Sequence, residues 1–155
     1  MQVATDLNMF VGIKAEKNTR NSNIPNCSHS VVVLFTSANR TMKALESARS
    51  LANTLCLPIV VLATPVIPYA LQLEEPHIPF DFTIRQFSKT AEQFPENIAV
   101  VAYRCRDRLE TLKQVLPPDS PVLIGIRKRW WPTGDERLAR DLGRAGYSVT
   151  VVETE

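Results

Sequence analysis

The hydrophobic pattern of the chain consists of short, continuous apolar runs separated by longer amphipathic segments. The runs lie at residues 31–35, 59–62, 98–103, 122–126 and 147–152. Continuous β-branched and apolar runs of this length are typical of strands that are buried on both faces of a parallel sheet. Each run therefore predicts one core strand.

Amphipathic segments connect these strands. Residues 41–55 place apolar side chains three or four positions apart, with charged and polar residues between them, which predicts a helix. Its expected inward side chains are Met42, Leu45, Ala48, Ala52 and Leu55. Further helices are predicted at 82–94, 107–116 and 135–145.

The order of elements is β-α-β-α-β-α-β-α-β, which predicts an α/β fold with a doubly wound, Rossmann-like, five-stranded parallel sheet. In such folds the ligand crevice lies beyond the carboxyl ends of the strands, at the point where the chain reverses its direction across the sheet. We therefore expect a site in the loops that follow Phe35 and Ile126.

The first 30 residues differ from the rest. Residues 18–30 are rich in turn formers and poor in apolar side chains, so we expect residues 1–30 to be a tail or linker and residues 31–155 to form one domain. Within the tail, residues 9–13 fit a short strand. A helix that turns Val3, Leu7, Phe10 and Val11 to one side fits equally well, and periodicity does not choose between the two.

Composition narrows the class of protein. The chain has 155 residues, 45% of them hydrophobic, and a formal net charge of +2, which suits one globular core and gives no general case for binding nucleic acid. No apolar run approaches the roughly 20 residues that span a bilayer, so we expect no membrane insertion. Three scattered cysteines fit a reducing, cytoplasmic compartment, and Cys56 is expected to pack in the helix or the core.

Several kinds of chemistry are disfavoured. No glycine occurs from residue 13 to 124, which excludes a Walker A loop or a dinucleotide fingerprint after the first strand. His29 and His77 stand far apart and no C-x-x-C occurs, so no metal site is expected. No serine or cysteine has recognisable histidine and acid partners, so we do not expect an enzyme. The lack of metal ligands and of a phosphate loop disfavours a phosphate-handling enzyme in particular.

Residues 31–52 resemble, without a gap, the opening of a universal stress protein domain. The run at 59–62 falls where that family has its second strand, and residues 122–139 resemble its fourth strand, glycine loop and last helix. The likeness covers about residues 31–153, and the loop rich in tryptophan and arginine is similar to the variant domains of potassium-sensing histidine kinases and of some transporters. It implies the adenine nucleotide alpha hydrolase-like form of the fold.

Members of this family that bind ATP carry three motifs, and the resemblance places Thr36, Gly125, Lys128 and Gly134 at their positions. With Ser37 and Arg127 from the predicted crevice loops, these are the candidate ligand-binding residues. The chain departs from each motif. Thr36 replaces an aspartate, Lys128 replaces the second glycine of Gly-x-x-Gly, and Gly134 is followed by Asp135 rather than Ser or Thr. ATP or another nucleotide bound in the family manner is therefore not expected, and no cofactor is assigned.

Residues 133–136 have the sequence of a helix capping box, Thr-Gly-Asp-Glu, which we favour over a phosphate-binding turn. In this interpretation the Thr133 hydroxyl accepts from a backbone N–H three residues on. The Asp135 carboxylate would oppose a phosphate at the same helix terminus by charge repulsion.

A basic cluster is expected at the crevice. Three cations follow the third strand and three follow the fourth, at Arg104, Arg106, Arg108, Arg127, Lys128 and Arg129. They fit either a pocket for a phosphorylated ligand, with Trp130 or Trp131 as a stacking face, or a solvated loop whose tryptophans close the core or a subunit contact; we favour the solvated loop. Cys105 is either a redox-sensitive thiol or, as we favour, a buried one. Thr36 and Ser37 either contact a ligand or cap the next helix.

The sequence therefore favours a non-catalytic regulatory or stress-response module of the universal stress protein type. We expect a homodimer through the last strand, residues 147–152, because a terminal edge strand exposes unpaired backbone groups. The alternative is a sensor that binds an anionic nucleotide or another phosphorylated ligand in the basic crevice and regulates a transporter or kinase.

Overall fold

The computed structural model describes residues 10–11, 30–67, 78–96 and 98–154. The strands are β1 (Phe10–Val11), β2 (Val31–Leu34), β3 (Ile59–Ala63), β4 (Ile98–Tyr103), β5 (Val122–Arg127) and β6 (Val149–Thr154). The helices are α1 (Ala38–Leu55), α2 (Ile78–Ala91), α3 (Arg108–Val115) and α4 (Gly134–Arg144).

The sheet has the order β1-β4-β3-β2-β5-β6, and its five main strands are all parallel. Val32 lies between Val60 of β3 and Val122 of β5, which places β2 at the centre. The predicted α/β class and doubly wound topology are confirmed. β1 is an additional strand, antiparallel to β4, and it confirms the strand alternative for the segment around Phe10.

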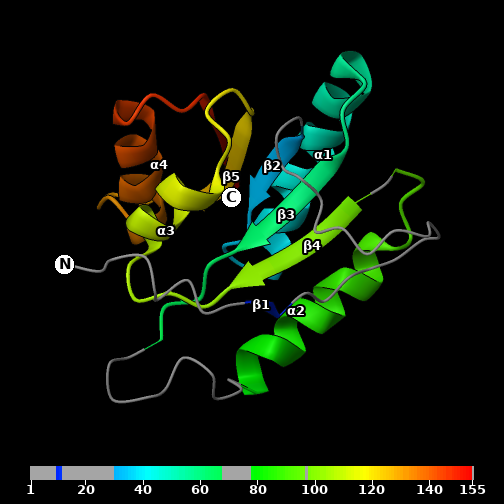
Figure 1. Ribbon diagram of the computed structural model, residues 1–155, viewed down its shortest axis with the longest axis horizontal. Helices are drawn as coiled ribbons and strands as arrows, with labels where there is room; N and C mark the ends of the chain where they lie inside the picture. Colours follow the sequence, from blue (N-terminus) through cyan, green and yellow to red (C-terminus); the bar gives the residue numbers. More distant parts are fainter. Residues whose placement is uncertain (1–9, 12–29, 68–77, 97, 155) are drawn as a thin grey trace.

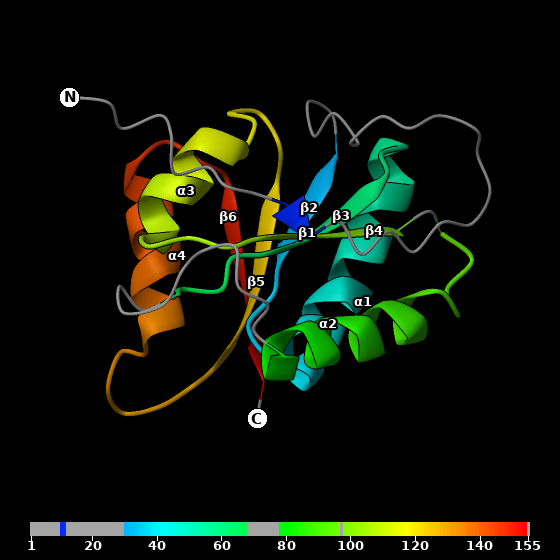
Figure 2. The same ribbon diagram turned by 60° about the horizontal axis from the view of Figure 1, so that its bottom comes forward.

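Helices cover both faces of the sheet, as Figures 1 and 2 show: α1 and α2 lie on one face, α3 and α4 on the other. Side chains of β2 alternate between the two cores because successive residues of a strand point to opposite faces. Val31 and Val33 pack with α1 and α2, whereas Val32 and Leu34 pack with α3 and α4. Burial on both faces explains the unbroken apolar runs.

Helix α1 begins three residues earlier than predicted. The Ser37 hydroxyl is its N-cap and accepts a hydrogen bond from the backbone N–H of Arg40, so the capping alternative for this side chain is confirmed. The helix ends at Leu55, which is 48% exposed rather than inward-facing. Cys56 follows as an exposed C-cap in the left-handed conformation, with φ of 54°, so the prediction that it packs in the helix or core is wrong.

The other boundaries move by a few residues. α2 begins and ends before the predicted 82–94, and α4 ends at Arg144, which leaves Ala145 exposed rather than inward-facing. β6 begins two residues later than predicted, at Val149. Among the described residues no helix is long and apolar enough to cross a bilayer.

Gly125 in the middle of β5 allows α1 to approach the sheet closely. A Cβ atom built on it would overlap with the backbone carbonyl group of Arg40, in the first turn of α1. The absence of a side chain at this one position therefore lets the start of α1 lie directly against β5. That contact places Ser37 and Arg40 beside the carboxyl end of β5.

We predict that Gly125→Ala lowers the free energy of unfolding by about 2 kcal/mol, because overpacking at a backbone contact forces the helix and strand apart. Urea unfolding followed by circular dichroism measures the change. Gly143→Ala is the matched control, since nothing lies within 4 Å of a Cβ there and the helical position gains about 0.5 kcal/mol. Equal stability of the two variants would contradict the close approach.

Candidate functional site

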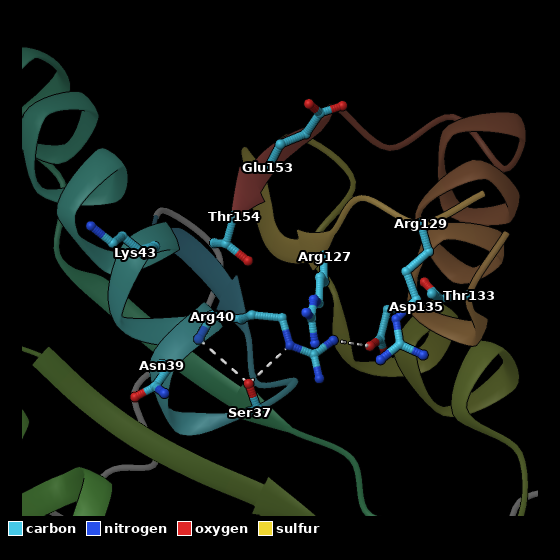
Figure 3. Close-up of a pocket in the computed structure, with 10 residues that line it drawn as sticks. All are labelled: Ser37, Asn39, Arg40, Lys43, Arg127, Arg129, Thr133, Asp135, Glu153 and Thr154. Atoms are coloured by element: carbon cyan, nitrogen blue, oxygen red, sulfur yellow. Dashed lines mark hydrogen bonds and ion pairs between the residues drawn. The ribbon is translucent and has the colours of Figure 1, made fainter. Parts of the chain in front are cut away.

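A cavity of about 750 Å³ opens at the carboxyl ends of β2 and β5, at the topological switch point where the sequence predicts a crevice. Figure 3 shows its lining, which comes from the start of α1, the β5–α4 connection and the end of β6. The lining residues are Ser37, Asn39, Arg40, Lys43, Arg127, Arg129, Thr133, Asp135, Glu153 and Thr154.

The lining is cationic overall. Two of its cations, Arg40 and Lys43, belong to α1. The other two are Arg127, the last residue of β5, and Arg129, which follows β5. The two carboxylates of the lining are both engaged in ion pairs, Asp135 with arginines described below and Glu153 with Lys128 at 3.8 Å. The cavity therefore offers positive charge and several N–H donors to an anion.

The Asp135 carboxylate joins two arginines from different helices. Its Oδ2 lies 3.1 Å from Nη1 of Arg40, and its Oδ1 lies 3.0 Å from Nη1 of Arg108. The sequence predicts that this carboxylate opposes a phosphate at the start of α4. Asp135 does stand in the first turn of α4, but each of its oxygens accepts a hydrogen bond from a guanidinium group. Its charge is compensated within the protein.

Both arginines are held in place by a second contact. Nε of Arg40 donates to the Ser37 hydroxyl at 3.0 Å, which Figure 3 shows, and Nε of Arg108 donates to the Thr64 hydroxyl at 3.3 Å. These contacts orient the two guanidinium groups toward the same point before any ligand arrives. Preorganised donors of this kind lose little side-chain entropy when they bind an oxyanion.

The Arg40–Asp135–Arg108 bridge divides the crevice. Asp135 lines the large cavity and also a smaller one of about 240 Å³. The smaller cavity is lined by Phe35, Thr36, Thr64, Pro65, Val66 and Arg108 as well. An extended ligand that occupied both cavities would have to break the bridge.

The candidate residues from the sequence occupy different places. Arg127 and Ser37 line the large cavity, whereas Thr36 lines the small one. The Thr36 hydroxyl donates to the carbonyl oxygen of Gly125 at 2.9 Å and so ties the end of β2 to β5. Lys128 turns toward Glu153 on β6 and is not part of the cavity lining.

The start of α4 follows the capping interpretation. The Thr133 hydroxyl accepts from the backbone N–H of Glu136 at 3.3 Å, and Gly134 is the first residue of the helix. Gly134 is absent from the lining of both cavities. The turn therefore caps a helix, as the capping box predicts.

The six predicted cations do not converge on one pocket, so that expectation is wrong. Arg104 is buried, and Arg106 donates through Nη1 to the carbonyl oxygen of Ile67 at 2.8 Å. Arg108 pairs with Asp135 and lines the small cavity, not the large one. The physical reason is strand order: β3 and β2 lie between β4 and β5, which separates the two groups of cations.

Sequence reasoning missed the two cations of α1. A helix that begins at residue 41 leaves Arg40 in the preceding loop and places Lys43 among its polar residues, whereas both line the cavity. The signal for Arg40 was Ser37, a favoured N-cap residue three positions earlier, which would have placed Arg40 in the first turn of the helix.

Cys105 and the two tryptophans have opposite environments. Cys105 is 2% exposed, its thiol donates to the carbonyl oxygens of Thr64 and Pro65, and burial raises its pKa, which confirms the buried interpretation over a redox-sensitive one. Trp130 and Trp131 are 100% and 82% exposed, so they do not close the core. No group of three His, Cys, Asp or Glu side chains able to hold a metal ion occurs among the described residues.

Comparisons with known proteins add little beyond the fold. No protein-family model matches the chain, and a search of curated proteins found no match. Among solved structures, the chain is similar to the crystal structure of a macrolide-efflux protein from Streptococcus pneumoniae, with 18% sequence identity and a TM-score of 0.40. The alignment covers 84% of this chain and 46% of that one, so this chain spans less than half the length of its neighbour. Function is therefore argued from the crevice.

We predict that Asp135→Asn lowers the free energy of unfolding by about 1–2 kcal/mol, because Arg40 and Arg108 lose a shared, partly buried counter-ion. Inorganic phosphate should restore part of this loss, since an oxyanion can take the place of the carboxylate between the two guanidinium groups. Thermal unfolding with and without phosphate measures both effects. Asp119→Asn, the same change in an exposed turn, is the control, and an equal response to phosphate in both variants would contradict the prediction.

Proposed function

We propose that the protein is a non-catalytic regulatory domain of the universal stress protein type whose crevice senses a small anionic ligand. The observation that carries the proposal is the cavity at the switch point, where Arg40, Lys43, Arg127 and Arg129 meet. The resemblance of residues 31–153 to the stress protein family supports the regulatory role. A regulated transporter or kinase in the cytoplasm fits the same resemblance.

The size and donors of the cavity support a phosphorylated or carboxylated small molecule. A volume of about 750 Å³ lies within the range of small-molecule sites. Guanidinium groups bind carboxylate and phosphate oxygens through paired, charge-assisted hydrogen bonds, and an ammonium adds a point charge. Because the cations come from two segments far apart in the chain, a bound anion would link α1 to the β5–α4 connection.

The divided crevice argues against ATP as the ligand. A nucleotide that extends across both cavities would displace the carboxylate of Asp135 from Arg40 and Arg108. The chain also lacks the glycines that would bring backbone N–H groups around a triphosphate. A compact anion in the large cavity meets neither obstacle.

A regulatory role without catalysis is supported by the hydroxyl groups of the lining. The Ser37 and Thr133 hydroxyls accept from backbone N–H groups at helix N-termini, and the Thr154 hydroxyl donates to the carbonyl oxygen of Ile126 at 3.1 Å. No histidine is among the lining residues of the cavity to act as a base for them. We infer that these hydroxyls position helices and strands.

We predict that pyrophosphate binds to the large cavity and that Arg127→Gln weakens its binding about tenfold, equivalent to about 1.4 kcal/mol. Arg140→Gln removes the same charge at an exposed position of α4, outside the cavity lining, and should change the affinity less than about twofold. Titration calorimetry measures both dissociation constants. Equal losses would show diffuse attraction rather than a site, and ATP binding with a dissociation constant below about 10 μM would contradict the choice of ligand.

We propose further that the domain forms a symmetric homodimer through β6. This strand pairs with β5 on one side, and no other described strand lies on its outer side. Val151 is 41% exposed on it, and edge backbone groups favour pairing with a second strand. β1 lies at the opposite edge, against β4, so the short N-terminal strand does not cover β6.

We predict that Val151→Lys converts the dimer into a monomer, because it places a charge on the strand that pairs across the two-fold axis. Light scattering at roughly 50 μM protein gives the mass. Leu55→Lys, at an exposed leucine on α1, is the control and should leave the dimer intact. A monomeric wild type, or a Val151→Lys variant with the mass of a dimer, would contradict this interface.

A further inference from the structure

The connection between β5 and α4 carries an exposed aromatic pair next to exposed cations. We call residues 127–132, with the sequence Arg-Lys-Arg-Trp-Trp-Pro, the tryptophan loop. Trp130 is 100% exposed and Trp131 is 82% exposed. In Figure 2 this connection swings out from the end of β5 before it returns to α4, at the lower left of the view.

This exposure differs from that of other apolar side chains in the described part of the chain. The remaining exposed large hydrophobic residues are single residues on separate elements: Leu55, Val66, Phe82 and Val151. Scattered single residues are normal on a protein surface, whereas adjacent exposed aromatics mark a contact with another molecule. Only in the tryptophan loop do two such residues stand together among the described residues.

The charge around the indoles indicates an anionic partner. Arg127, Lys128 and Arg129 are all exposed and directly precede them. Glu153 pairs with Lys128 at 3.8 Å, where both side chains are largely exposed, and Asp135 pairs with arginines of α1 and α3. The loop therefore presents apolar rings at its tip and positive charge at its base.

We propose that the tryptophan loop docks the domain on an anionic phospholipid surface, with both indoles in the interfacial layer and the cations of residues 127–129 against headgroup phosphates. Indole rings favour the interface between lipid and water because one edge of the ring is polar and the rest is apolar. Basic residues beside them are attracted by the negative surface potential of such a membrane. This peripheral contact needs no membrane-spanning helix.

A lipid surface fits the geometry better than an acidic protein or a single-stranded nucleic acid. The Trp130 side chain is fully exposed, so it does not lie in a groove that could enclose a side chain or a base of a partner. The fluid interface of a lipid bilayer can surround a projecting ring that does not lie in a groove. Arg127 and Arg129 also line the cavity, but the indoles and Lys128 do not, so the docking proposal needs no ligand in the cavity.

Tryptophan fluorescence tests this directly, since the only two tryptophans of the chain are in the loop. We expect the emission maximum to shift to shorter wavelength with vesicles that contain about 30% phosphatidylglycerol in phosphatidylcholine, and much less with pure phosphatidylcholine. Co-sedimentation with the anionic vesicles should weaken as salt rises, because the charge contribution is screened.

Variants separate the loop from the rest of the surface and from the cavity. The double change Trp130→Ser and Trp131→Ser should reduce sedimentation at least tenfold, and Lys128→Glu at least threefold, with unchanged thermal unfolding. Phe82→Ser, at an exposed aromatic residue of α2, should have no effect. Lys43→Gln should weaken binding of free pyrophosphate and leave vesicle binding intact, so failure of the anion site and failure of membrane docking give different results.

Three results would overturn the proposal. One is the absence of a spectral shift and of sedimentation with anionic vesicles. Another is an equal shift with soluble glycerol phosphate, which would assign the effect to a free anion. The third is a stronger response to polyglutamate or to an oligothymidylate, which would assign the loop to a protein or nucleic-acid partner.

Discussion

The parallel pairing of β2 with strands on both of its sides governs the rest of this structure. Parallel neighbours need crossover connections, and those connections place helices on both faces, so the central strands are buried above and below. The chain leaves β2 toward β3 in one half of the sheet and returns to β5 in the other half. The carboxyl ends of β2 and β5 consequently face a crevice that neither pair of helices fills.

The crevice depends on one close backbone contact and one shared charge. Gly125 lets the first turn of α1 lie on β5, and this brings Arg40 within 3.1 Å of the Asp135 carboxylate on α4. Arg108 approaches the same carboxylate from α3. Three helices from both faces of the sheet thus meet at a single aspartate, which pairs with two guanidinium groups and lines both cavities.

Three polar side chains at the crevice already have partners within the protein. The Thr36 hydroxyl donates to the Gly125 carbonyl oxygen, and the Thr133 hydroxyl caps α4. Asp135 occupies the point between two arginines that a ligand oxyanion would otherwise fill. The positive charge of the large cavity comes from the cationic side chains of its lining.

Sequence alone determined the fold class and the place of the crevice. Runs such as 31–35 and 122–126 are apolar without interruption because both faces of those strands are buried, and that requirement acts on every residue in turn. The ends of helices do not follow from apolar spacing, because a cap depends on one side chain. The Ser37 cap starts α1 three residues earlier than the apolar spacing predicts.

The composition of the site was decided by tertiary structure. Arg104 and Arg106 look equivalent to Arg127 and Arg129 along the chain, but two intervening strands keep them apart, and Arg40 joins the cavity from 87 positions before Arg127. Lys128 directly follows Arg127 in the chain but is outside the cavity lining and pairs with Glu153 of β6. Local sequence encodes hydrophobic burial at each position, whereas the partner of a charged side chain depends on which distant segments the sheet order brings together.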